Sequence, residues 1–87
     1  MTWRIEYRPD VIEHDIPALP KTARLRIQKA IEQRLATEPM LYGKPLRFNL
    51  SGLRRIRVGD YRVIYCLNQG TKAVVITAID HRKDVYE

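Results

Sequence analysis

The sequence of 87 residues has one cysteine and no long apolar run. A single thiol, Cys66, cannot form an internal disulfide and has no companion for a thiolate metal site, which fits a reducing compartment. No apolar run approaches the roughly 18 to 20 residues that a bilayer span needs. The first residues, Met1 to Arg4, lack the apolar core of a signal peptide. We therefore expect a soluble protein of the cytoplasm, without a membrane partner.

Signatures of metal and cofactor chemistry are also missing. The two histidines, His14 and His81, are far apart in the sequence and lack metal-ligand spacing. There is no glycine-rich phosphate loop, and Ser51 has no evident base nearby. Cys66 is best explained as an inert, small apolar residue. We expect neither a metal nor a cofactor.

The chain is too short for two domains, so residues 1–87 should form one. Apolar residues make up 45% of the sequence and charged residues 30%. These proportions are ordinary for globular proteins and far from those of disordered chains. The chain should therefore fold around a single core.

Positive charge is concentrated in the middle of the chain. Sixteen Lys and Arg against ten Asp and Glu give a formal net charge of +6, and residues 21–57 hold ten of the basic groups and two of the acidic ones. Such a block suggests a phosphate-rich or otherwise acidic partner. A cationic but otherwise unremarkable soluble surface is the alternative, and charge alone does not decide between them.

The first half of the chain predicts one strand and two helices. Residues 2–8 alternate between apolar and polar side chains, the pattern of a strand with one buried face. A short amphipathic helix follows over residues 11–16, and a longer one begins at Pro20 and ends at Glu38-Pro39. The apolar face of the longer helix consists of Ala23, Ile27, Ala30, Ile31 and Leu35. The two helices should form a hairpin whose apolar side needs a sheet to cover it.

The second half of the chain predicts a sheet. Residues 39–52 contain two prolines and two glycines, so we expect mostly loop that wraps an edge, with residues 46–50 as an extended candidate. Three strands joined by tight hairpins follow over residues 53–58, 61–67 and 72–79. The order β-α-α-β-β-β predicts an α+β fold, in which a helical hairpin covers one face of a small, mainly antiparallel sheet.

The first of these hairpins gathers arginines. A two-residue turn at residues 59–60 fixes the register so that Arg57 faces Arg62. Because side chains alternate along a strand, Arg55, Arg57 and Arg62 should point together away from the helices. Like charges directly opposite one another destabilise a strand pair, so something should offset the repulsion.

Two explanations of the arginine cluster are open. An internal acid, Asp60, Asp80 or Asp84, can neutralise it in a solvated ion-pair network that is worth little. Alternatively, several guanidinium groups on one rigid face suit bidentate recognition of a phosphate. We favour the phosphate interpretation.

The last strand should bring further residues to the cluster. In the expected register Thr77 lies opposite Arg62, so that His81 and Arg82 emerge beside the arginines. Histidine exchanges a proton near neutral pH whereas arginine stays charged, which makes His81 the candidate proton carrier. Tyr86 could stack on a base or offer its hydroxyl to a phosphate, and packing into the edge of the core is an equal alternative.

Three segments carry a resemblance to a known family. From Leu50 to Tyr65 the sequence runs Leu-Ser-Gly-Leu-Arg-Arg-Ile-Arg-Val-Gly-Asp-Tyr-Arg-Val-Ile-Tyr, which closely resembles the RelE branch of the RelE/ParE toxin superfamily. Residues 79–86 look like the C-terminal motif of that family, and Leu19-Pro20-Lys21 looks like the start of its long helix. The resemblance implies a RelE-like fold. It also implies a toxin of a toxin–antitoxin pair that cuts messenger RNA in the ribosomal decoding site.

The resemblance also implies roles for individual residues. The implied catalytic residues are Arg62, His81, Arg82 and Tyr86, and the implied substrate-binding residues are Arg54, Arg55 and Arg57. The basic ones would hold the scissile phosphate while the adjacent 2′-hydroxyl attacks it without a metal, leaving a 2′,3′-cyclic phosphate and a 5′-hydroxyl. RelE itself has lysines where Arg55 and Arg57 stand, which shifts the expected acid–base role to His81.

The implied partners are a cognate antitoxin, the ribosome and messenger RNA. A heterotetramer with the antitoxin is one assembly to consider. We expect the antitoxin to be acidic or to carry an amphipathic helix, and to cover the arginines. Two other functions stay open, a ParE-like inhibitor of DNA gyrase without nuclease chemistry and a degenerate protein that only binds an antitoxin. The presence of Arg62, His81-Arg82 and Tyr86 favours the nuclease.

Overall fold

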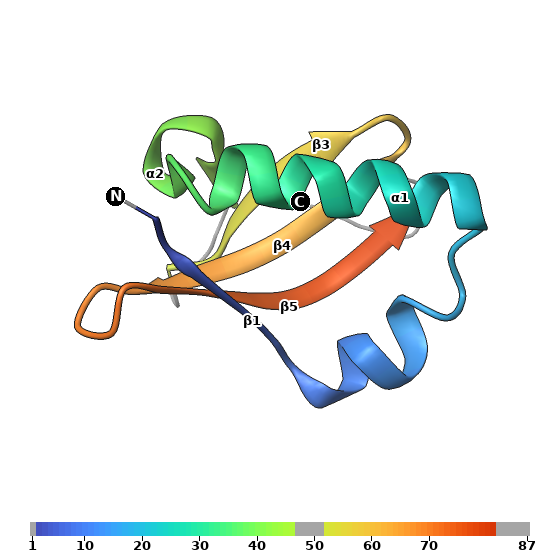
Figure 1. Ribbon diagram of the computed structural model, residues 1–87, viewed down its shortest axis with the longest axis horizontal. Coiled ribbons are helices and arrows are strands. Elements are labelled where there is room, and N and C mark those ends of the chain that lie inside the picture. The colour runs from blue at the N-terminus through green and yellow to red at the C-terminus, as the bar shows by residue number, and fades with distance from the viewer. Residues whose placement is uncertain (1, 47–51, 82–87) are drawn as a thin grey trace.

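The computed structural model describes residues 2–46 and 52–81, which form one sheet with helices packed against it (Figure 1). In chain order the elements are β1 (Arg4–Tyr7), η1 (Val11–Asp15), α1 (Lys21–Ala30), η2 (Ile31–Leu35), α2 (Pro39–Tyr42), β2 (Lys44–Pro45), β3 (Arg54–Val58), β4 (Tyr61–Asn68) and β5 (Ala73–His81). The predicted α+β class is confirmed. None of the described helices is long and apolar enough to cross a membrane.

The described strands form a five-stranded sheet in the order β1-β5-β4-β3-β2. β1 pairs with β5 in parallel, and the other neighbouring pairs are antiparallel. The sheet is therefore mainly antiparallel, as expected. Because β2 pairs with β3 through two residues alone, part of the outer edge of β3 is left uncovered by β2.

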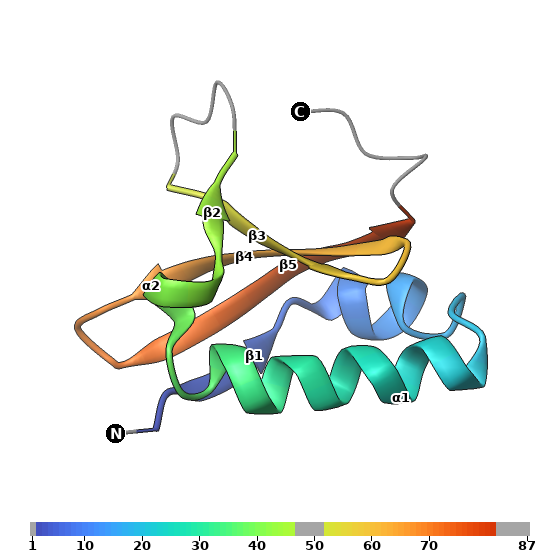
Figure 2. The ribbon, with the colours of Figure 1, turned by 90° about the horizontal axis from the view of Figure 1, so that it is seen from above.

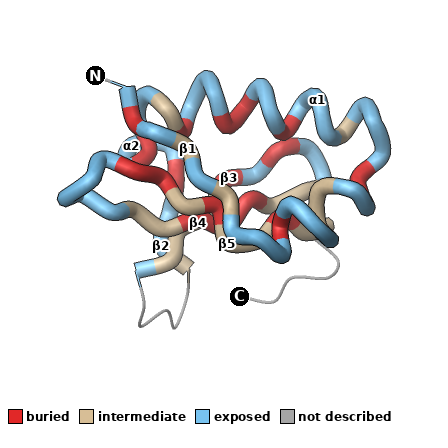
Figure 3. The backbone as a smooth tube through the Cα atoms, turned by 60° about the horizontal axis from the view of Figure 1, so that its bottom comes forward, coloured by how far each residue is buried: buried red, intermediate tan, exposed pale blue. Residues whose placement is uncertain are grey.

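Helix α1 continues directly into η2, and the two lie along one face of the sheet (Figure 2). Their predicted apolar face is confirmed, since Ile27, Ala30, Ile31 and Leu35 are buried and Ala23 is half-buried. Figure 3 shows buried positions recurring among exposed ones along α1, the pattern of an amphipathic helix. These side chains pack with strand residues that include Ile56, Val63, Tyr65, Val74, Ile76 and Ile79.

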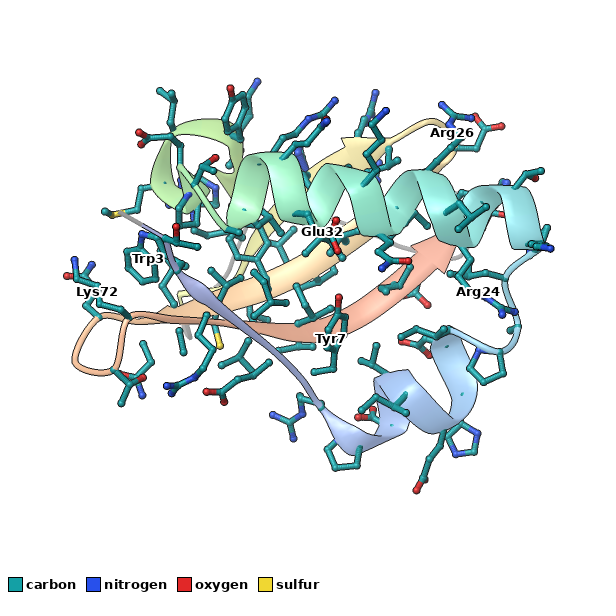
Figure 4. All side chains as sticks on the ribbon, in the orientation of Figure 1. Trp3, Tyr7, Arg24, Arg26, Glu32 and Lys72 are labelled. Carbon is teal, nitrogen blue, oxygen red and sulfur yellow. The ribbon has the colours of Figure 1, made fainter. Side chains whose placement is uncertain are left out.

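The start of β1 is anchored at two places. Trp3 N–H donates to the Ala36 carbonyl oxygen just after η2 (2.6 Å), and the Arg4 N–H donates to the Lys72 carbonyl oxygen (2.9 Å). The Lys72 ammonium also lies 5.1 Å from the centroid of the Trp3 ring (Figure 4), within the range of a cation–π contact. These contacts hold the first strand against the end of the long helix and against β5.

The segment between the long helix and β3 differs from the prediction. We expected mostly loop, but the structure has the one-turn helix α2 followed by the short strand β2. Pro39 occupies the first turn of α2, where its missing N–H has no helical partner to lose. The strand lies at Lys44–Pro45, ahead of the extended candidate, of which residues 47–50 are outside the described residues. The predicted wrapping of an edge is confirmed, because β2 pairs along the edge of β3.

Two side chains from the sheet tie α2 in place. The hydroxyl of Tyr65, a fully buried residue, donates to the Pro39 carbonyl oxygen (2.6 Å). Arg54 Nη2 donates to the carbonyl oxygens of Met40 (2.9 Å) and Gly43 (2.5 Å). Burial raises the pKa of Tyr65, against the opposing influence of Arg54. Helix α2 and the entry to β2 are therefore held at three backbone carbonyl groups.

Gly43 has no room for a side chain, because a Cβ at this position would overlap the Tyr65 hydroxyl. Gly43→Ala should therefore lower the free energy of unfolding by about 1–3 kcal/mol, the usual cost of overpacking. Urea unfolding followed by circular dichroism measures the change. Gly70→Ala is the matched control, since a Cβ there would make an ordinary 3.4 Å contact with Asn68 Oδ1. Equal losses of stability in the two variants would contradict this packing.

Candidate functional site

The β3–β4 hairpin turns at residues 59–60, as predicted. Gly59 has a φ of 62°, a left-handed conformation that suits glycine in a tight turn. Arg26 reaches from α1 toward this turn (Figure 4), and a Cβ on Gly59 would lie 3.2 Å from Arg26 Nη2. Arg57 lies opposite Arg62. The predicted register is confirmed.

The two faces of the hairpin differ as predicted. On the helix side the buried residues are Ile56, Val58, Val63 and Tyr65. On the other side Arg57 is exposed, and Arg55 and Arg62 are half-buried. Strand β2 adds Lys44, which pairs with Arg55 and is exposed. We call the set Lys44, Arg55, Arg57, Arg62 and Asp80 the arginine face.

The register of β5 differs from the prediction, because Asp80 rather than Thr77 lies opposite Arg62. Strand β4 runs one residue further than expected and β5 begins one residue later, after Lys72 with a φ of 56°. A β-bulge then adds one residue, Thr77, whose hydroxyl donates to the Ile64 carbonyl oxygen (3.2 Å). This bulge could not be recognised from the apolar alternation along the strand.

Arg57, Arg62 and Asp80 form one row across β3, β4 and β5. Asp80 is thus in place to offset part of the repulsion between the two facing arginines. Within the arginine face this carboxylate stands against four cations, which include Lys44 and Arg55. An internal acid, as the first explanation expected, is therefore present in the row, whereas Asp84 lies outside the described residues and the phosphate explanation stays a prediction.

The far edge of the same sheet face is balanced in charge. In β1, Arg4 Nη2 lies 2.9 Å from Glu6 Oε2, in an exposed pair of the kind that contributes little to stability. Over residues 2–46 and 52–81, no three His, Cys, Asp or Glu side chains lie close enough together to hold a metal ion. The guanidinium and ammonium groups of the arginine face are suited to the binding of anions.

His81 does not lie on the arginine face. It pairs with Tyr61 on the helix side of the sheet, and the two rings meet edge to face with centroids 5.2 Å apart. A hollow at this corner is also lined by Asp15, whose Oδ2 accepts the Ile79 N–H (3.0 Å). The predicted placement of His81 was wrong because β5 is displaced by three residues, and an odd displacement exchanges the two faces of a strand.

Arg54 also lies on the helix side, opposite Tyr65. Its guanidinium donates to the carbonyl oxygens of Met40, in α2, and of Gly43, just after it, which gives Arg54 a structural role, and its substrate-binding role stays an expectation. Arg82 and Tyr86 lie outside the described residues, and their implied roles stay expectations.

A polar hollow of about 410 Å³ lies beside the arginine face, at the edge of β3. Its described lining residues are Tyr42, Lys44, Arg55, Ile56 and Arg57, and we call it the edge hollow. Tyr42 and Lys44 were not predicted as site residues, because both lie in the segment expected to be loop. A strand of two residues is too short to produce a recognisable alternation.

The sequence is similar to those of known toxins. The family described as ParE toxin of type II toxin–antitoxin system, parDE, matches residues 3–86. Toxin RelG of Mycobacterium tuberculosis is 44% identical over 52 residues, which is 60% of each protein. Toxin RelE of the same organism is 36% identical over 72 residues, 83% of this chain and 74% of that protein. The match therefore spans less than two thirds of RelG.

The fold has a close counterpart among solved structures. In the toxin–antitoxin complex RelBE2 of Mycobacterium tuberculosis, one chain matches with a TM-score of 0.81 and 29% identity. The match covers 94% of this chain and 100% of that one. The RelE-like arrangement of sheet and helices, expected from the sequence, is thereby confirmed.

The row of charges predicts an increase in stability when Arg57 is replaced. Arg57→Gln removes the charge that opposes Arg62 and leaves Asp80 facing a cation, so the free energy of unfolding should rise by about 0.2–1 kcal/mol. The gain should shrink in about 1 M salt, where charges are screened. Urea unfolding at low and high salt measures both effects.

Arg62→Gln is the control for this experiment. It removes the same repulsion, but it also takes away the cation that Asp80 faces across the sheet. It should therefore stabilise the protein less than Arg57→Gln does. A loss of stability in Arg57→Gln that salt leaves unchanged would count against the arrangement.

Proposed function

Because the chain belongs to the ParE toxin family of type II toxin–antitoxin systems and has a RelE-like fold, we propose that it is a toxin that cleaves messenger RNA on the ribosome. The observation that carries the proposal is the arginine face. In the part of the chain that the structure describes, four cations lie there on the sheet face opposite the helices, with one carboxylate among them. Guanidinium groups match the geometry of phosphate oxygens and stay charged at any physiological pH. The names of the RelE and RelG relatives support the same assignment.

The proposed reaction is an internal transfer at phosphorus. The 2′-hydroxyl oxygen of one nucleotide attacks the adjacent phosphorus, the bond to the 5′ oxygen of the next nucleotide breaks, and the products are a 2′,3′-cyclic phosphate and a 5′-hydroxyl. Negative charge builds on the nonbridging oxygens during the attack. Arg57 and Arg62 are held in register by the sheet, so they stabilise this charge without having to reorganise. Arg55 binds the same RNA strand. No step of the proposed reaction uses a metal ion.

Of the other catalytic residues that the resemblance implies, two keep a role in the proposed reaction and one does not. We keep Arg82 as a further phosphate ligand and Tyr86 as the residue that stacks on or orients the nucleotide, on the strength of the resemblance. We assign His81 no contact with the phosphate, because its ring packs on Tyr61 on the opposite face of the sheet. Arginine supports charge rather than proton transfer, so the arginine face acts mainly by electrostatic stabilisation.

A cognate antitoxin is the proposed protein partner. The matching RelBE2 structure is a toxin–antitoxin complex. The excess of cations on the arginine face suits an acidic segment of such a partner, laid over the site. Neutralisation would then follow from occlusion of the phosphate-binding groups.

Inhibition of DNA gyrase is the second candidate, favoured by the ParE name of the matching family. It requires binding without RNA cleavage. A translating extract separates the two, because the nuclease leaves cuts within codons whereas a gyrase inhibitor leaves messenger RNA intact and stops supercoiling.

Removal of one arginine should abolish most of the cleavage. Arg62→Ala should slow the cutting of messenger RNA in a translating extract by about 10²- to 10³-fold, the usual effect of deleting one donor to a developing anion. Mapping of the new 5′ ends measures the rate. Arg4→Ala is the matched control, because Arg4 lies on the same sheet face but is paired with Glu6 at the far edge. Equal rates of messenger RNA cleavage by the two variants would contradict the proposed site.

The position of His81 predicts an unchanged pH dependence when it is replaced. The pH–rate profile of His81→Ala should keep the shape of the wild-type profile between about pH 5 and 8, the interval in which histidine titrates. Arg62→Ala should lower the rate by a similar factor at each pH. If His81→Ala alone lost one limb of the pH–rate profile, His81 would be assigned a role as general acid or base.

A further inference from the structure

Tyr42 is an aromatic residue that the core does not use. Its side chain is 50% exposed, and its neighbours Met40 and Leu41 in α2 are exposed as well. Single exposed apolar side chains are common and need no explanation. Tyr42 differs from these two neighbours because it lines the edge hollow beside three cationic side chains.

The edge hollow exists because the β2–β3 ladder is short. Lys44 pairs with Arg55, so continuation of the same antiparallel register would bring Tyr42 level with Arg57. Tyr42 instead belongs to α2. The space between this helix and the strand is lined by Tyr42 from α2 and by Arg55 and Arg57 from β3.

The backbone around Tyr42 is held by hydrogen bonds from side chains of the sheet. Arg54 Nη2 donates to the carbonyl oxygens of Met40 and Gly43, which flank Tyr42 in the sequence. The Tyr65 hydroxyl holds the first carbonyl of the helix. The ring therefore projects from a one-turn helix that has little freedom to move, which lowers the entropy cost of stacking on it.

We infer that Tyr42 is a base-stacking residue for single-stranded RNA, with the phosphate of the same nucleotide bound by Lys44, Arg55 and Arg57. The inference rests on the proposed function and deepens it, because it names where a base next to the cleavage site is held. A volume of about 410 Å³ is within the range of pockets for small ligands. A basic track with an aromatic face beside it is how single strands are commonly bound.

A nucleotide suits the edge hollow better than a helical peptide does. Among the described residues that line it there are three cations and no carboxylate, which favours an anion. An amphipathic helix would also need a groove for apolar side chains spaced three and four residues apart. The apolar lining here is the Tyr42 ring and Ile56, which is itself buried. One flat ring matches one base.

The test compares a strand that has bases with one that has none. The first probe is a short single-stranded RNA with 2′-O-methyl groups, which cannot be cleaved because the attacking oxygen is blocked. The second is an abasic strand of the same length and charge. Wild-type protein should bind the first more tightly. Tyr42→Ala should weaken binding of the first by about 5- to 150-fold, the effect of losing one base–aromatic stack, and should bind the abasic strand as the wild type does.

Two variants control for the ring and for the helix. Tyr42→Phe keeps the aromatic face and should restore the preference for the strand with bases. Leu41→Ala changes a neighbouring side chain that is 72% exposed and is not among the described lining residues, so it should bind both strands like the wild type. Thermal unfolding of each variant checks that α2 is retained.

The outcomes separate this inference from the proposed function. Unchanged discrimination between the strands in Tyr42→Ala overturns the stacking role, and so does an equal loss for both strands. Weaker binding of an acidic amphipathic peptide, with RNA binding unaffected, overturns it in favour of a protein partner. In the translating extract, cutting by Tyr42→Ala at unchanged positions overturns the stacking role alone. Intact messenger RNA with the wild type overturns the nuclease.

Discussion

The pairing of Arg57 with Arg62 across the β3–β4 hairpin is the constraint on which the proposed chemistry depends. The turn at Gly59 sets the register, and a slip of one residue would carry every side chain of the slipped strand to the other face of the sheet. The pair costs stability in the free protein because like charges face each other. Under the proposed function, a phosphate bound between the two guanidinium groups offsets this repulsion, so its binding should raise the free energy of unfolding.

Alternation along β3 gives neighbouring arginines different tasks. Arg54 points to the helix side and holds the backbone of α2, whereas Arg55 points to the open side and lines the edge hollow. The structural arginine thereby positions the element that carries Tyr42, and the next one contributes charge to the surface that Tyr42 borders. The two sides of a single strand are coupled in this way through the short helix that wraps its edge.

Local patterns were sufficient for much of the fold. The amphipathic face of α1 and η2 and the two-residue turn of the first hairpin follow from spacing and turn chemistry, and both are confirmed. The position of β5 did not follow, because a later turn and a bulge at Thr77 leave the apolar pattern nearly unchanged while moving Asp80 beside Arg62. A single error in register also misplaced His81.

The sequence by itself determined the fold class, the arginine hairpin and the family resemblance, because each depends on residues close together in the chain. Tertiary structure alone decided which charged groups share a surface. It placed Asp80 in the arginine row, moved His81 to the helix side, tied Arg54 to the backbone of α2, and opened the edge hollow beside Tyr42. These placements depend on pairing between distant segments, where one added residue reverses the face that a side chain occupies.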